Sequence, residues 1–180
     1  MSELPVIFTD LDGTLLDHDT YSAEEARSVL EKVTAKGIPV IPATSKTYDE
    51  VVEFRESMNL THAFIVENGA AIYVPMDTDI RCPMGSKLFE GYWVREFGVK
   101  RQALCDVLEA LDMNGSYQFK SLTDMRTSEV AEITGLDLAS AQRAQHRLYS
   151  ETLDWRDSEA ALTAFSDVLT GIGFSVSLGG

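Results

Sequence analysis

The sequence predicts an α/β protein in which parallel strands alternate with helices. A nearly continuous apolar run at residues 6–8 is typical of a strand buried on both faces of a parallel sheet. Strand, helix and strand follow one another over residues 6–43, which indicates a right-handed βαβ unit. Hydrophobic residues make up 44% of 180 residues, enough for a core in one domain or two small ones.

The first predicted strand ends in two aspartates, Asp10 and Asp12, which are followed by Gly13. Side chains two positions apart on an extended segment point the same way, so both carboxylates can face one small volume. Such strands place ligands just beyond their carboxyl ends. Two neighbouring carboxylates repel each other unless a cation or a shared proton compensates, and Mg²⁺ is the natural hard cation. A plain Asp-Gly turn is the structural alternative.

The next elements are a helix and a second strand. Ser22 and Glu25 have capping-box spacing, apolar residues follow on one helical face, and Gly37 closes the predicted helix. Residues 38–43 form the second predicted strand, which is short and apolar. Together with the first strand they complete the βαβ unit.

Thr44, Ser45 and Lys46 lie between the carboxyl end of the second strand and the amino end of another helix. Thr47 and Glu50 have capping-box spacing at the start of that helix. Free backbone N–H groups, a hydroxyl and the positive end of the helix dipole favour a phosphate at such a position, and Lys46 adds a full charge. A capped helix with a solvated lysine is the structural alternative.

The third strand is predicted at residues 63–66, and Asn68-Gly69 beyond it is a strong hairpin signal. Residues 75–86 have the composition of a linker. Further strands are predicted at residues 89–97, 117–122, 152–155 and 174–178, with helices at residues 104–111, 138–148 and 161–169. We therefore expect an N-terminal core at residues 1–80 and a small α+β cap at residues 81–180.

The overall charge limits the partners. A net charge of −14 disfavours binding of nucleic acid, and an anionic substrate needs a local metal ion or a few placed lysines and arginines. Cys82 and Cys105 are too few for a disulfide framework and lack metal-site spacing. We see no signal peptide and no apolar run of membrane-spanning length, so we expect a cytoplasmic protein without a membrane partner. The oligomeric state stays open.

The string Asp-Leu-Asp-Gly-Thr-Leu-Leu-Asp at residues 10–17, after an apolar strand, resembles the first motif of the haloacid dehalogenase superfamily. The resemblance implies a Rossmann-like parallel core and a phosphatase mechanism with Mg²⁺. It implies that Asp10 is the nucleophile that becomes an aspartyl-phosphate and that Asp12 is the general acid/base. Both aspartates would also bind the metal.

Further motifs extend this resemblance. Thr44 resembles the second-motif hydroxyl that holds a phosphoryl oxygen, and Ser45 would contribute its N–H while Lys46 balances charge. Asn68 and Gly69 resemble a segment that lies close to the substrate in the subgroup with a large inserted cap. Stretches 44–47, 67–70, 132–136, 147–151, 155–158 and 179–180 look like those of mannosyl-3-phosphoglycerate phosphatases and their bacterial relatives.

The resemblance implies a small phosphorylated sugar or sugar acid as substrate, most specifically mannosyl-3-phosphoglycerate. Another sugar phosphatase, a phosphomutase, or a non-catalytic truncated binding module are the alternatives. The third-motif lysine and the fourth-motif acidic pair, which supplies the third acidic metal ligand, have no counterpart in this sequence. We therefore expect an incomplete core plus a cap, a first strand with an open apolar edge, and no activity of the 180-residue chain alone.

Overall fold

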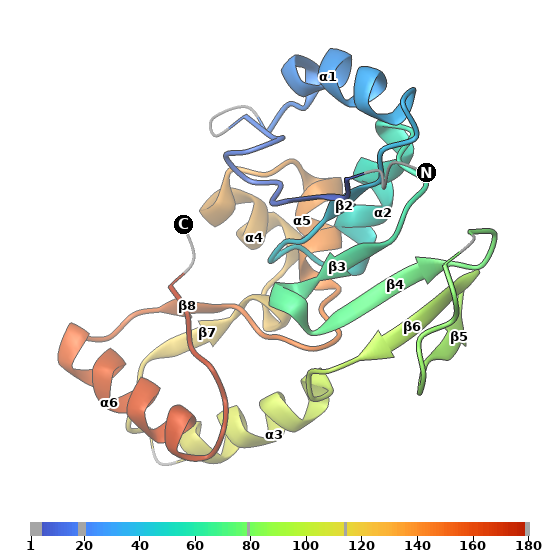
Figure 1. The fold of residues 1–180 in the computed structure, drawn as a ribbon. Helices are drawn as coiled ribbons and strands as arrows, with labels where there is room; N and C mark the ends of the chain where they lie inside the picture. Colours follow the sequence, from blue (N-terminus) through green and yellow to red (C-terminus); the bar gives the residue numbers. More distant parts are fainter. Residues whose placement is uncertain (1–4, 18–20, 79, 114, 179–180) are drawn as a thin grey trace.

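A computed structural model describes residues 5–17, 21–78, 80–113 and 115–178 (Figure 1). The N-terminal elements are β1 (Ile7–Thr9), α1 (Glu24–Thr34), β2 (Val40–Pro42), α2 (Tyr48–Ser57), β3 (Phe64–Val66), the short 3₁₀ turn η1 (Glu67–Gly69) and β4 (Ala71–Pro75). The following elements are β5 (Lys87–Phe89), β6 (Tyr92–Glu96), α3 (Arg101–Asp112), β7 (Phe119–Ser121), η2 (Leu122–Asp124), α4 (Thr127–Thr134), α5 (Leu138–Gln145), β8 (Leu153–Trp155) and α6 (Glu159–Gly171).

The first three strands run parallel, which confirms the predicted α/β class and the βαβ unit. β1 pairs with β2, with Ile7 opposite Val40. A parallel bridge between Ala43 and Ile65 joins β2 to β3. Beyond β3 the strands are antiparallel in the order β3-β4-β6-β5. Because β1, β2 and β3 are parallel, their carboxyl ends meet at one edge of the sheet.

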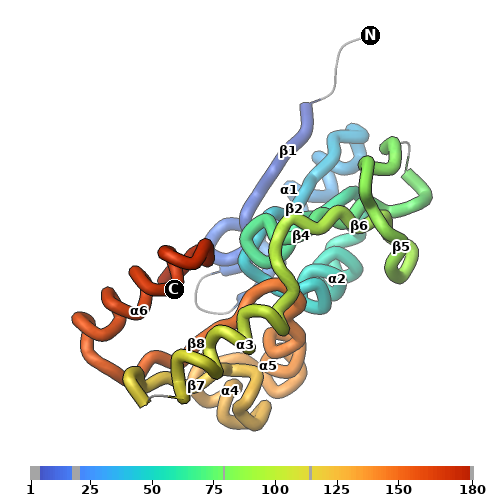
Figure 2. Tube along the Cα trace, turned by 90° about the horizontal axis from the view of Figure 1, so that it is seen from below, coloured from blue at the N-terminus to red at the C-terminus, as the bar shows by residue number. Residues whose placement is uncertain are grey.

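The prediction that the first strand is buried is wrong. Val6, Ile7 and Phe8 are 49%, 37% and 63% exposed. Among the described residues β1 has one strand partner, β2, so its other edge is open, and Figure 2 shows β1 at the margin of the fold. An apolar run in the sequence favours burial, but burial also requires other helices or strands that pack against it. The exposure agrees with the expected open apolar edge.

The capping boxes predicted for the first two helices have different outcomes. The predicted capping box of α2 is confirmed, because Glu50 N donates to Thr47 Oγ1 at 3.3 Å and Thr47 N donates to Glu50 Oε2 at 2.9 Å. The predicted box at Ser22 is wrong. The N-cap of α1 is Ala23, and Ser22 Oγ accepts from Glu24 N at 3.3 Å instead.

Three further predictions need correction. Residues 89–97 are not one strand but span the end of β5, a turn and β6, because Glu90 and Gly91 adopt positive φ angles of 44° and 84° in a two-residue turn between the two strands. Helix α4 was not predicted, since it is short and buries only Val130. Residues 174–178 form no strand. Phe174 instead packs against the side chains between α3 and α6.

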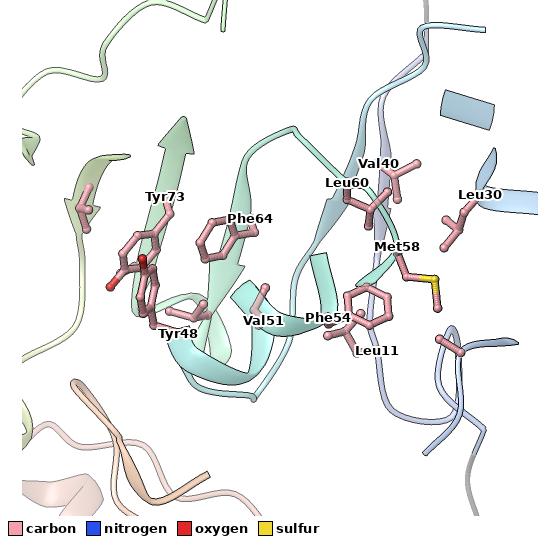
Figure 3. Packing of buried hydrophobic residues seen from close by; sticks show 14 of the residues in the cluster. Leu11, Leu30, Val40, Tyr48, Val51, Phe54, Met58, Leu60, Phe64 and Tyr73 are labelled. Carbon is pink, nitrogen blue, oxygen red and sulfur yellow. The ribbon is translucent and has the colours of Figure 1, made fainter. Parts of the chain in front are cut away.

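The largest buried cluster lies between the sheet and helices α1 and α2 (Figure 3). At one end Phe64 stacks on Tyr73 at 4.9 Å between ring centroids, and Tyr48 lies 4.8 Å from Tyr73. The guanidinium carbon of Arg55 lies 4.5 Å from the centroid of Phe64. At the other end of the cluster, Leu30 of α1 lies close to Val40 of β2 and to Met58 (Figure 3). This cluster fixes α2 against the sheet and thereby fixes its amino end.

The second half of the chain has two smaller clusters. Helices α3 and α6 pack against the two-stranded antiparallel sheet β7-β8 around Phe165, which is 1% exposed. Helices α4 and α5 pack around Val130 and Ala141, which are fully buried. The division of the chain at residue 80 stays a prediction. In the described part of the chain no helix is long and apolar enough to cross a membrane.

Phe64→Ala tests the aromatic end of the core. Phe64 is 0% exposed, so the substitution leaves a cavity and removes the stacking on Tyr73. Unfolding in urea should show a loss of about 3–5 kcal/mol in the free energy of unfolding. Phe89→Ala, at a side chain that is 37% exposed, should cost clearly less. Equal losses would contradict the assignment of Phe64 to the centre of the core.

Glu96 on β6 interacts with one tyrosine and two lysine side chains. Its Oε1 accepts from Tyr149 Oη at 2.5 Å and pairs with Lys87 at 2.9 Å and with Lys100. Burial alone would raise the pKa of Glu96, but the hydrogen bonds from Lys100, Tyr149 and Lys87 outweigh it and lower the pKa to about 2. A carboxyl with a lowered pKa stabilises the folded state above its unfolded pKa, and this stabilisation is lost as pH falls through the folded value.

Glu96→Gln should therefore destabilise the protein near neutral pH and lose its disadvantage in acid. The difference in free energy of unfolding between wild type and variant should shrink from about pH 4.5 down to about pH 2. Urea titrations at several pH values measure it. Glu56→Gln, on the exposed face of α2, serves as the charge-matched control. A pH-independent difference would show that Glu96 acts through packing rather than through its charge.

Candidate active site at the carboxyl ends of the parallel strands

Asp10 and Asp12 follow β1 directly. Both residues are exposed, whereas Leu11 between them is 0% exposed. This alternation turns both carboxylates away from the core. Asp10 Oδ1 accepts a hydrogen bond from Leu11 N at 2.7 Å, and the chain reverses at Gly13, whose φ of +64° suits glycine.

Lys46 brings the loop after β2 to the loop after β1. Its Nζ lies 2.9 Å from Asp12 Oδ1 and 3.4 Å from Glu50 Oε1, and its side chain is 14% exposed. Burial by itself lowers the pKa of Lys46, but the carboxylates of Glu50 and Asp12 more than offset this, so the pKa is raised. Lys46 thus keeps its positive charge beside Asp12.

The loop at residues 44–46 has the geometry of a strand-to-helix turn. Thr44 is 4% exposed, and its Oγ1 accepts from Lys46 N at 3.3 Å. Ser45 is exposed at the tip of the loop. Because α2 begins one residue after the capping Thr47, this tip lies at the positive end of the helix dipole. The arrangement suits an anionic group.

The turn after β3 is tied to the same loop through the backbone. Asn68 N donates to Thr44 O and Glu67 N donates to Lys46 O, each at 3.0 Å. Asn68 and Gly69 are exposed and have positive φ angles of 59° and 89°. Glu67 also has a positive φ of 47°, which is uncommon for a residue with a long side chain. The structure therefore brings the predicted residues of all three strand ends together.

Glu67 is a functional candidate that sequence reasoning missed. Its residue is 3% exposed, and its carboxylate accepts from Leu148 N at 2.9 Å, Tyr149 N at 3.0 Å and Ser150 Oγ at 2.6 Å. The signal available in the sequence was an acidic residue at the end of an apolar strand, together with the distinctive stretch 147–151. No local spacing links the two, because they are more than 80 residues apart.

The second half of the chain also contacts the start of α2. Thr47 Oγ1 donates to Arg143 O at 2.9 Å, and His146 Nδ1 lies 2.7 Å from Asp49 Oδ2. Arg143 forms an ion pair with Glu53. These contacts place the end of α5 over the amino end of α2, beside the loop at residues 44–46.

A cavity of about 290 Å³ opens between these halves. It is lined by Lys46 and by side chains of α1, α2 and α5 with their flanking loops, among them Tyr21, Arg27, Glu50 and Arg143. Its walls combine apolar groups with carboxylates and guanidinium groups, a mixture that suits a polyhydroxylated or anionic molecule.

The described residues do not complete a metal site by themselves. Asp10 and Asp12 offer two carboxylate groups of the type that Mg²⁺ prefers. No cluster of three or more histidine, cysteine, aspartate or glutamate side chains that could hold a metal ion occurs among the residues described.

Comparison of the sequence with known proteins finds a matching family model and similar phosphatases. Residues 7–84 match the family model of the haloacid dehalogenase-like hydrolases. A glucosyl-3-phosphoglycerate/mannosyl-3-phosphoglycerate phosphatase from Methanococcoides burtonii is 35% identical over 175 residues, covering 97% of this chain and 64% of the relative. A mannosyl-3-phosphoglycerate phosphatase from Pyrococcus furiosus is 36% identical over 148 residues, covering 82% and 59%. The chain thus spans less than two thirds of the length of these relatives.

Solved structures share the fold at low sequence identity. A Thermoplasma acidophilum protein, 0175, has a TM-score of 0.65 and 14% identity, covering 98% of this chain and 61% of that protein. A sugar phosphatase of haloacid dehalogenase subclass IIB has a TM-score of 0.56 and 19% identity, covering 94% and 64%. Residues 7–84 thus resemble the haloacid dehalogenase-like hydrolases in sequence, and the described residues share their fold with these solved structures.

Proposed function

We propose that the protein is a phosphomonoesterase that acts through an aspartyl-phosphate on Asp10. Its proposed substrate is a phosphorylated sugar or sugar acid, most specifically mannosyl-3-phosphoglycerate. The observation that carries the proposal is the 2.9 Å contact of Lys46 Nζ with Asp12, which joins the aspartate pair to the anion-suited loop at residues 44–46. The substrate is supported by the names of the relatives from Methanococcoides burtonii and Pyrococcus furiosus.

In the proposed mechanism Asp10 attacks phosphorus in line, and the bond from phosphorus to the leaving oxygen breaks. Asp12 gives its proton to that oxygen, so the sugar part leaves as an alcohol. Asp12 then takes a proton from a water molecule that attacks the aspartyl-phosphate. Inorganic phosphate leaves, and the carboxylate of Asp10 is restored.

The loop at residues 44–46 is proposed to hold the phosphoryl group during both steps. Thr44 Oγ1 and the N–H of Ser45 would donate to phosphoryl oxygens, while Lys46 offsets part of their charge. This role follows from the nature of phosphoryl transfer, in which catalysis is mostly positioning and electrostatic stabilisation. Asn68 and Gly69 are proposed to line the substrate, since they are exposed next to Thr44.

Mg²⁺ is the proposed cofactor, with Asp10 and Asp12 as two of its ligands. When bound, it would neutralise negative charge on the phosphoryl oxygens. The described residues supply a partial set of donors, so no step of the mechanism is routed through the ion. We further propose that residues 81–180 form a cap that reads the rest of the substrate, and that the protein acts in the cytoplasm.

Asp10→Asn tests the nucleophile in the protein expressed from its complete reading frame. The amide nearly conserves the shape of the side chain but cannot form the aspartyl-phosphate. Turnover of mannosyl-3-phosphoglycerate should fall by more than about 100-fold, because loss of a covalent nucleophile costs several powers of ten. Phosphate release measures it, with Asp167→Asn on the exposed face of α6 as control. Retention of more than about a hundredth of the activity would exclude this role.

Asp12→Asn should separate the two halves of the reaction. General acid–base help is worth about 10²–10⁴-fold, so steady-state turnover should fall within that range. Where attack by Asp10 survives and water activation fails, phosphorylated protein should accumulate. Rapid-quench labelling with a ³²P-labelled substrate detects it. Wild-type turnover in the variant would refute the assignment of Asp12 as proton carrier.

A further inference from the structure

Arg147 extends from the segment after α5 to the tip of the loop at residues 44–46. Its Nη1 donates to Ser150 Oγ at 2.7 Å and makes a long contact of 3.4 Å with Ser45 O. Ser45 is exposed next to Lys46, whose charge is already engaged by Asp12 and Glu50. Arg147 therefore brings a second cation to the strand ends of a chain with a net charge of −14.

The position of this guanidinium is set by a relay of hydrogen bonds. Ser150 Oγ accepts from Arg147 and donates to Glu67 Oε2 at 2.6 Å, which uses the single proton of the hydroxyl. Glu67 also accepts from two backbone N–H groups of the same segment. Because the backbone of Glu67 is bonded to Lys46 O, the relay connects Arg147 to the loop on which it rests.

One donor of Arg147 has no partner. Its Nε is buried and makes no hydrogen bond within the described part of the chain. A buried donor on a charged group is costly to leave without a hydrogen bond, so an acceptor that reaches this guanidinium would stabilise it. The planar fork of a guanidinium matches a carboxylate or a phosphate with two parallel hydrogen bonds.

The position of Arg147 relative to the proposed phosphate loop indicates which of these two groups it would meet. The ammonium of Lys46 is on the side of the loop that faces Asp12, and the hydroxyl of Thr44 accepts from the backbone N–H of Lys46. Arg147 instead contacts the carbonyl oxygen of Ser45, which repels any anionic oxygen, so an anion bound by the guanidinium would lie on the side of Arg147 away from this loop. The guanidinium therefore lies beyond the proposed phosphate position, where the remainder of the substrate would lie.

Building on the proposed function, we propose that Arg147 binds a substrate carboxylate next to the phosphoryl group, as in a phosphoglycerate. Glu67 and Ser150 act as positioning residues that hold Arg147 in place. The site then selects phosphate esters that carry a second anionic group a few bonds from the phosphorus atom, and it disfavours neutral sugar phosphates.

The test compares two probes that differ only in this group. 3-Phosphoglycerate carries a carboxylate where glycerol 3-phosphate carries a hydroxymethyl group. Calorimetry on the complete protein with Asp10→Asn avoids turnover. Adding Arg147→Gln should weaken binding of 3-phosphoglycerate about 10- to 100-fold, the range expected for charged hydrogen bonds, and change glycerol 3-phosphate by less than about threefold. Ser150→Ala keeps the charge of Arg147 but removes the relay. It should weaken binding of 3-phosphoglycerate more than binding of glycerol 3-phosphate, and by a smaller factor than Arg147→Gln.

Arg126→Gln controls for net charge, since that side chain is 81% exposed and pairs with Glu129. Equal losses for both probes would overturn the proposal and assign Arg147 to the phosphate. Unchanged binding of both, or no measurable binding of 3-phosphoglycerate before the Arg147 change, would also overturn it. If Arg147→Gln fails to fold by circular dichroism, Arg147→Lys and Ser150→Ala decide. Failure of the proposed function is seen separately, as absent hydrolysis by the protein without Asp10→Asn.

Discussion

The hydrogen bonds of Glu67 are the interaction on which the arrangement of the site depends. A carboxylate that is almost completely buried is expensive unless its oxygens are paired. Glu67 meets this condition with three donors from residues 148–150, while its own N–H is bonded to the loop after β2. The unusual positive φ of Glu67 is sustained by these bonds. One residue therefore fixes the turn after β3, the anion-suited loop and a segment of the second half relative to one another.

Charge balance is the second constraint. Asp10, Asp12 and Glu50 gather at the strand ends of a chain that is already strongly acidic, and Lys46 compensates two of these carboxylates by direct contact. An incoming phosphate ester adds further negative charge, so additional cations must approach from outside this pair. Arg147 arrives from the second half of the chain, and Mg²⁺ is the proposed third source of positive charge. The parallel strands contribute to this because the loops after β1 and β2 hold Asp10, Asp12 and Lys46 at one edge of the sheet.

Local patterns in the sequence predicted part of the fold. The capping box at Thr47 and Glu50 is confirmed, whereas the same spacing at Ser22 and Glu25 forms no box. The predicted alternation of the first strands with helices is also confirmed. Burial of residues 6–8 was predicted wrongly, since it depends on elements that cover the strand. The contact of Glu67 with residues 148–150 follows from tertiary packing alone, and no spacing rule reaches across more than 80 residues. The predicted strand at residues 174–178 is wrong, and Phe174 packs against side chains of α3 and α6 instead.

In the proposed site, the residues that carry out the reaction are positioned by local contacts, and the residue that selects the substrate is positioned by long-range contacts. The proposed nucleophile and acid lie two residues apart on one strand end, so their relation is set by backbone geometry and is insensitive to the rest of the chain. The guanidinium of Arg147 is held by side-chain contacts within a distant segment, and neither hydrogen bond of this relay involves Asp10 or Asp12. Substitution of Arg147, which is not one of the three donors to Glu67, would therefore alter which anion is accepted while the hydrogen bonds of Glu67 stay in place. A fold built in this way can vary its substrate through residues that are remote in sequence from those that carry the reaction.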